Sequence, residues 1–200
     1  MTGLLAHTHF MPGLTPATIT ERDTLIAFLR QQRYVLKLAA YGLTGEQAQA
    51  APSASALSVG GVIKHVALTE QHWMRRIVQA EQYGNPEDEY ANGFRLVGDE
   101  TIESVLAFYD DVAAATEAYI AERDLDELVA IPKGVPWFPQ DDDYWSLRWV
   151  LVHIIEETAR HAGHADIVRE SIDGANAFAL LAQYETAQGN RPAWADFLPA

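Results

Sequence analysis

The chain has 200 residues, of which 48% are hydrophobic and 21% charged, a composition typical of a folded globular domain. Its net charge of -14 argues against a nucleic-acid-binding surface, and the absence of cysteine excludes disulfides, thiolate metal sites and a cysteine nucleophile. Neither a membrane span nor a signal peptide is evident, so we expect a cytoplasmic protein without membrane partners.

The first segment with helical periodicity follows residues 1–17, which we treat as an N-terminal segment. Thr18 and Glu21 have the spacing of a capping box, and Gly42 is suited to the end of the helix. Apolar residues three and four positions apart predict a buried stripe, formed by Leu25, Phe28, Leu29, Leu36 and Leu43.

A second helix is predicted over residues 58–84, with Ser58 as its N-cap. Gly60 and Gly61 lower helix propensity but permit close approach by a neighbouring backbone. One face of this helix, with spacings of three and four, carries Val62, His65, Leu68, His72 and Arg75.

The third helix is expected over residues 101–124, after a polar, glycine-rich loop at 85–100. Thr101 is its predicted N-cap. Its predicted buried stripe contains Ile102, Val105, Leu106, Tyr109, Val112 and Tyr119. Residues 125–145 are too rich in proline for regular structure, and no segment has the alternation typical of a strand.

Ser146 is expected to begin the fourth helix, which ends at Gly174. The tail, residues 175–200, is predicted to pack on the helices because it keeps many apolar side chains, namely Phe178, Leu180, Leu181, Tyr184, Trp194 and Phe197. The sequence thus predicts an all-α protein, a four-helix bundle over residues 18–174 with a short packed tail.

The apolar seam of the fourth helix leads directly into Glu157, His161 and His164. A carboxylate there costs several kcal/mol unless it is paired, hydrogen-bonded or metal-bound. Glu157 and His161 lie one turn apart and can share a cation with a third ligand from a facing helix. On spacing alone His65 and His72 are both candidates for that ligand, and a metal-free ion pair between Glu157 and His161 explains the same pattern.

Two stretches, "LSVGGVIKHVALTEQHW" and "SLRWVLVHIIEETARHAGHADIVRE", resemble the motifs of the DinB/YfiT-like superfamily. These are four-helix-bundle metalloenzymes of the up-down-down-up type, and they include mycothiol-dependent maleylpyruvate isomerase and thiol S-transferases. The resemblance runs from about residue 18 to 174. It matches the isomerase-like branch, in which the metal set is His-Glu-His, and implies His65, Glu157 and His161 as ligands.

The resemblance implies a divalent-metal-dependent enzyme that uses a low-molecular-weight thiol such as mycothiol, namely an S-transferase or a related detoxification enzyme. Zinc suits a His2Glu set best, with nickel, iron or manganese as alternatives. A non-catalytic metal- or ligand-binding stress-response bundle is the competing interpretation. The expected partners are a small-molecule substrate and, by resemblance, a second copy of the chain in a homodimer.

Other polar residues near the predicted ligands receive supporting roles as hypotheses. His164 supports the ligands or acts as an acid or base, and His153 orients Glu157. Both could equally be structural histidines. Arg75, Arg76 and His72 could bind a substrate carboxylate, although arginines there also suit an ordinary exposed helix face.

Overall fold

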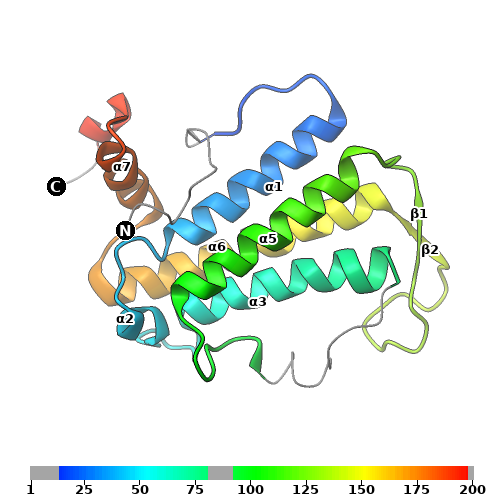
Figure 1. Ribbon diagram of the computed structural model, residues 1–200, viewed down its shortest axis with the longest axis horizontal. Coiled ribbons are helices and arrows are strands. Elements are labelled where there is room, and N and C mark those ends of the chain that lie inside the picture. Colours follow the sequence, from blue (N-terminus) through cyan, green and yellow to red (C-terminus); the bar gives the residue numbers. More distant parts are fainter. Residues whose placement is uncertain (1–13, 81–91, 198–200) are drawn as a thin grey trace.

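The computed structural model describes residues 14–80 and 92–197, apart from the side chain of Arg76. This part of the chain is mostly helical, as the sequence predicts. Figure 1 shows long helices lying side by side, with α1 and α6 running in one direction and α3 and α5 in the other. Their bounds are α1 (Glu21–Leu38), α3 (Val59–Gln71), α5 (Ile102–Ala121) and α6 (Leu147–Asp173).

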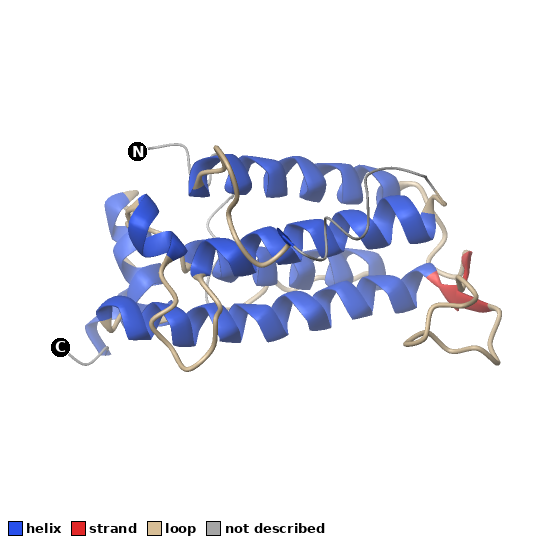
Figure 2. Cartoon of the chain, turned by 90° about the horizontal axis from the view of Figure 1, so that it is seen from below, coloured by secondary structure: helices blue, strands red, loops and turns tan. Residues whose placement is uncertain are grey.

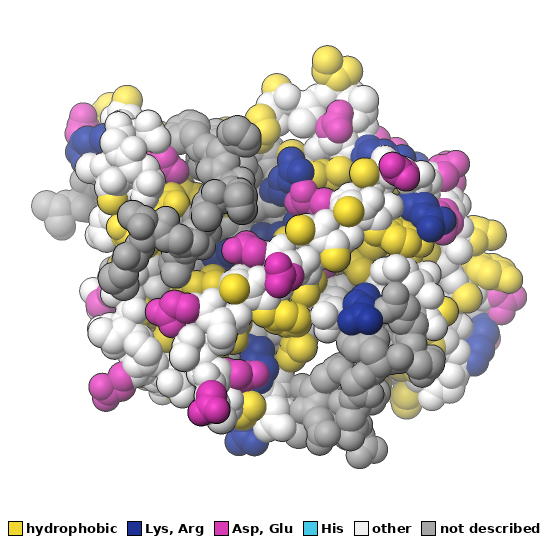
Figure 3. All heavy atoms as spheres, viewed as in Figure 1, with side chains coloured by type: hydrophobic (Ala, Val, Ile, Leu, Met, Phe, Trp, Pro, Cys, Tyr) yellow, Lys and Arg dark blue, Asp and Glu magenta, His cyan; other side chains and the backbone are white. Residues whose placement is uncertain are grey.

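The long helices are packed in pairs, α1 against α6 and α3 against both α5 and α6 (Figure 2). Shorter elements complete the described chain: α2 (Gly45–Gln49), the π-helical turn η1 (His72–Val78), α7 (Ala177–Ala187) and the 3-10 turn η2 (Ala193–Phe197). None of the described helices is long and apolar enough to cross a membrane. On the face of the molecule shown in Figure 3, acidic side chains are scattered among hydrophobic and basic ones, in keeping with the net charge of -14.

Three of the predicted helix starts are confirmed. The side chains of Ser58, Thr101 and Ser146 each accept a hydrogen bond from the backbone N–H three residues later. The predicted end of the fourth helix is also confirmed, since Gly174 caps α6 in the left-handed region with φ 77°. These local signals therefore set the ends of the helices that carry the site.

The predicted start of the first helix is wrong by two residues. Thr20, and not Thr18, caps α1, and its hydroxyl accepts from the backbone N–H of Asp23 at 3.1 Å. The predicted stripe is also wrong at Phe28, which is 44% exposed, whereas Leu29 and Leu36 are buried. Phe28 precedes Leu29 by one helical step of about 100°, which turns its side chain away from the core.

The second predicted helix changes type before its expected end. The α-helical part stops at Gln71, and the chain continues as η1 to Val78, where the N–H of Gln79 bonds to the carbonyl of Met74 at 3.2 Å. That five-residue spacing is the signature of a π-helix. Residues 81–84 of the predicted helix lie outside the described residues.

The expectation of no strands is wrong over a short stretch. β1 (Leu128–Ala130) pairs antiparallel with β2 (Tyr144–Ser146), and Val129 lies opposite Trp145. Each strand has only three residues, too few for the alternation of buried and exposed residues to be visible in the sequence. Val129 and Trp145 are both buried, so the pair closes the core at the N-terminal end of α6.

The tail packs on α1 through α7, as predicted. Leu180 and Leu181 join Tyr34 and Leu38 of α1 in a small apolar cluster, and the Tyr34 hydroxyl donates to Glu185 at 3.0 Å. Two tail residues that we expected to pack, Phe178 and Phe197, are mostly exposed.

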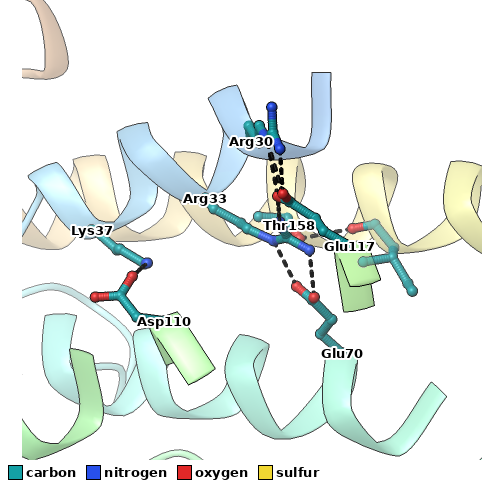
Figure 4. Close-up of polar contacts among 8 residues, drawn as sticks. Arg30, Arg33, Lys37, Glu70, Asp110, Glu117 and Thr158 are labelled. Atoms are coloured by element: carbon teal, nitrogen blue, oxygen red, sulfur yellow. Dashed lines mark hydrogen bonds and ion pairs between the residues drawn. The ribbon is translucent and has the colours of Figure 1, made fainter. Parts of the chain in front are cut away.

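A polar layer lies across the interior where α1, α3 and α5 meet (Figure 4). The guanidinium of Arg33 donates to Glu70 at 2.5 and 2.9 Å and to Glu117 at 2.8 Å. Side-chain exposure is 4% for Arg33 and 1% for Glu70, so this is a fully desolvated ion pair. Nearby, Lys37 of α1 pairs with Asp110 of α5. The buried carboxylate of Glu70 on α3 is therefore already paired with the guanidinium of Arg33 on α1.

Candidate functional site

Two histidines from different helices meet at the contact between α3 and α6. The imidazole rings of His65 and His161 have centroids 4.7 Å apart at an interplanar angle of 64°. His161 is buried and His65 is half-buried. The structure thus brings together the two imidazoles that the resemblance implies as metal ligands.

The third predicted ligand lies beside His161 on the same helix. An oxygen of the Glu157 carboxylate is 3.4 Å from Nε2 of His161. The Glu157 side chain is 29% exposed, so it lies at the edge of the interior and is only partly desolvated. Because the two residues are four apart, the α-helix itself sets this proximity.

The environment keeps both imidazoles in the neutral form. Burial lowers the pKa of His65 to about 4, and the neighbouring His161 adds to the effect. Burial also lowers the pKa of His161, although the charge of Glu157 acts in the opposite direction. Neutral imidazole is the form that binds metals, so both rings are available as ligands at neutral pH.

A loop residue that the sequence did not indicate covers His65. The ring of Phe94 stacks on His65 with centroids 3.7 Å apart and an interplanar angle of 17°. The loop can come this close because Gly61 has no side chain, since a Cβ there would lie 1.9 Å from the carbonyl oxygen of Phe94. The predicted close approach at Gly61 is confirmed, and it was the one signal in the sequence for this contact.

His164 lies within reach of His161. Nδ1 of His164 is 3.3 Å from Nδ1 of His161, so one ring donates and the other accepts. The described contacts of His153 are with the rings of Trp73 and Trp149 and, at 3.9 Å, with Glu156.

The three candidate substrate-binding residues, His72, Arg75 and Arg76, all lie in η1. Arg75 lines a cavity of about 420 Å³ between η1 and α5, together with Asp111 and Thr116. The histidine pair lies between α3 and α6, so this cavity belongs to a different helix contact. His72 begins η1 and is half-buried, while the side chain of Arg76 lies outside the described part.

The chemistry of the donors fits a divalent cation, but their placement is not that of a closed metal site. Two neutral imidazoles and a carboxylate from two helices are a common ligand set for zinc. Among residues 14–80 and 92–197, however, no three His, Asp or Glu side chains converge closely enough to hold one ion. His65, Glu157 and His161 are neighbours whose side chains would have to rotate to share a cation.

Comparison with known proteins gives a family match and a match in fold. A model of the mycothiol S-transferase family matches residues 24–174, which include His65, Glu157 and His161. No curated protein matches. Among solved structures, a conserved protein from Enterococcus faecalis superposes with a TM-score of 0.56 at 14% identity, over 79% of this chain and 100% of that one. At that identity the likeness concerns the fold alone.

Proposed function

The chain belongs to the mycothiol S-transferase family, within the DinB/YfiT-like superfamily, and we propose that it transfers a low-molecular-weight thiol to an electrophilic small molecule. The observation that carries the proposal is the meeting of His65 and His161 across α3 and α6, with Glu157 beside them. These residues lie within the matched region, and Glu157 is partly exposed beside the buried His161.

We propose that His65, Glu157 and His161 hold a divalent cation, most suitably zinc, with nickel, iron and manganese as the alternatives that elemental analysis would distinguish. When bound, such an ion would lower the pKa of a thiol that coordinates it. The lowered pKa values of His65 and His161 support the assignment because neither ring must release a proton to become a ligand near pH 7.

The chain has no cysteine, so the reacting sulfur must arrive on the cosubstrate, for which mycothiol is the proposed compound. In the proposed reaction the sulfur forms a bond to the electrophilic carbon. The bond from that carbon to its leaving group breaks, and the leaving group departs with the electron pair. The thiol proton passes to a base, and His164 is suitably placed for this at 3.3 Å from His161.

The test is a matrix of thiols and electrophiles. Mycothiol, glutathione and bacillithiol would each be combined with iodoacetamide and 1-chloro-2,4-dinitrobenzene, with and without a chelator. We expect turnover with mycothiol that a chelator abolishes and zinc restores. Metal binding without turnover for any pair would favour the alternative, a non-catalytic metal- or ligand-binding bundle.

A pair of glutamates provides the matched control. Glu156 lies next to Glu157 in α6 but forms its ion pair with Arg160 on the outside of the helix. We expect Glu157→Ala to lower kcat/KM about a hundredfold, because it removes a proposed metal ligand. Glu156→Ala should keep kcat/KM within about twofold of the wild-type value. Equal activity of the two variants would remove Glu157 from the site.

Three further properties belong to this proposal. We infer that α1, α3, α5 and α6 form a four-helix bundle of the up-down-down-up type, which their directions in Figure 1 support. A cytoplasmic location suits a reaction that needs a reduced thiol. A homodimer is part of the proposal by resemblance to the family, and light scattering of the purified protein would test it.

A further inference from the structure

A cavity of about 420 Å³ lies between η1 and α5, in a part of the molecule that the proposed thiol transfer does not use. Gln71, at the end of α3, borders this cavity, whereas His65 of the same helix meets His161 of α6. Six residues correspond to about 240° of rotation around an α-helix, so the cavity and the histidine pair lie on different sides of α3. The volume falls within the range of about 300–1,000 Å³ that small-molecule sites occupy.

The change of helix type accounts for the space beside α5. α3 packs along α5, but beyond Gln71 the chain continues as the π-helical turn η1. A π-turn lacks the regular ridges, four residues apart, that fit the grooves of a neighbouring α-helix. The backbone N–H and the side chain of Gln79 both donate to the Met74 carbonyl, at 3.2 and 3.0 Å, and hold this turn in place. Because π-turns are rare and frequently occur at functional sites, the cavity is a candidate for one.

The inner lining of the cavity is apolar except for one hydroxyl. Met74 and Val112 are buried there, and Phe108 is half-buried. Thr116 also lines the cavity and is 1% exposed, and within the described part of the chain its hydroxyl makes no hydrogen bond. A buried hydroxyl without a partner costs free energy, which a hydrogen bond to a bound molecule would offset.

The two walls of the cavity carry opposite charges, Arg75 on η1 and Asp111 on α5. The guanidinium of Arg75 has five N–H donors, so it can bind a carboxylate while it keeps other contacts. The carboxylate of Asp111 is exposed and can accept hydrogen bonds from an ammonium group. Among the described residues that line the cavity, these two carry the only charges. One charge of each sign suits a zwitterion better than a polyanion, which needs several cations.

We propose that this cavity binds an apolar α-amino acid, with its carboxylate on Arg75 and its ammonium group on Asp111. The apolar side chain of the ligand packs against the inner lining, and the Thr116 hydroxyl supplies one further hydrogen bond. The site involves no covalent step and shares no residue with the histidine pair. The inference therefore does not depend on the proposed thiol transfer.

The test is a titration of the full chain with L-phenylalanine and two analogues, followed by amide-detected NMR. L-phenylalaninamide lacks the carboxylate, and 3-phenylpropionate lacks the ammonium group. We expect L-phenylalanine to give saturable shifts of amides in residues 71–79 and 108–116, and both analogues to bind more weakly. The absence of saturable shifts in these two segments at up to about 10 mM amino acid would overturn the inference.

Charge variants match each wall to one end of the ligand. Asp111→Asn should weaken binding of L-phenylalanine about 2- to 5-fold, the range of an exposed ion pair, and should not weaken binding of 3-phenylpropionate. Arg75→Gln should weaken binding of L-phenylalanine and leave binding of L-phenylalaninamide unchanged. Equal losses for the amino acid and its analogue in both variants would overturn the assignment of a zwitterion.

Two further substitutions separate ligand binding from a structural role. Thr116→Val keeps the shape of the side chain, so the free energy of unfolding should not fall, while the affinity for L-phenylalanine should drop about 2- to 12-fold. Ala115→Phe should abolish binding, because Ala115 lines the cavity and is exposed, so that the ring can occupy the cavity without disturbing the core. Ala114→Phe is the matched control, since Ala114 is also exposed but does not line the cavity. Wild-type affinity in Ala115→Phe would overturn the inference.

Discussion

His65 of α3 and His161 of α6 lie edge to face, with ring centroids 4.7 Å apart, and burial lowers the pKa of both. Each ring comes from a helix whose start is set by a serine cap, Ser58 or Ser146. The position of the pair therefore follows from local helix signals and from the packing of α3 on α6.

The close approach of the Phe94 loop to α3 depends on Gly61. Gly61→Ala should destabilise the protein by about 1–3 kcal/mol, because the new Cβ would overlap the Phe94 carbonyl and force the loop outward. Gly163→Ala is the matched control in α6, where a Cβ meets nothing within 4 Å, and it should stabilise by about 0.5–1 kcal/mol. Urea denaturation measures both values, and a destabilising effect of equal size at both sites would contradict this account.

The Arg33–Glu70 pair should be the most sensitive part of the polar layer (Figure 4). Glu70→Gln should destabilise by about 3–5 kcal/mol, because it leaves the buried guanidinium with only the partly exposed carboxylate of Glu117. The double variant Arg33→Met/Glu70→Leu should lose less than Glu70→Gln, since it removes both charges. Chemical denaturation of the three proteins checks the order, and a double variant less stable than the single one would show that the layer is needed for packing.

The carboxyl group of Asp166 makes the free energy of unfolding depend on pH. Burial, with a contribution from the charge of Glu170, raises the pKa of Asp166 from 3.8 to about 6. Between about pH 4 and pH 6 the folded protein keeps a proton that the unfolded chain releases, so this term lowers the free energy of unfolding as pH rises. Asp166→Asn should therefore gain stability relative to wild type as the pH is raised from about 4 to 7.

Asp173 is the control of opposite sign for this experiment. A hydrogen bond from Arg169 lowers the pKa of Asp173, so its contribution is present above pH 3.8 and is lost as the pH falls below that value. Asp173→Asn should be less stable than wild type at pH 7, and the difference should shrink in acid. Parallel pH profiles for the two variants would contradict both assignments.

Much of the fold could be predicted because the signals are local. Ser58, Thr101, Ser146 and Gly174 set helix ends through hydrogen bonds within one turn, and such patterns are readable in sequence. The exposure of Phe28 could not be predicted, because it depends on the rotation of α1 relative to α6. The short β1–β2 pair also depends on tertiary contacts, since its strands join residues on both sides of a proline-rich loop.

In the candidate site, too, contacts within one helix could be predicted from the sequence, and contacts between elements could not. Glu157 and His161 are neighbours on one helix, so their proximity follows directly from spacing. Choosing His65 over His72 as the partner required the register between helices, which spacing did not give. The contact of Phe94 with His65 could not be predicted, because Phe94 lies in a loop far from His65 in sequence. The one sequence feature related to it is Gly61, where the absence of a side chain leaves space for the Phe94 backbone.

Metal content tests the central claim most directly. Protein purified from zinc-supplemented cells and desalted would be analysed by inductively coupled plasma mass spectrometry, as wild type and as His65→Ala, Glu157→Ala, His161→Ala and Glu156→Ala. The account predicts about one divalent ion per chain in the wild type and in Glu156→Ala, and a large loss in the other three. Full metal content in His65→Ala, Glu157→Ala and His161→Ala, or none in the wild type after reconstitution, would contradict it.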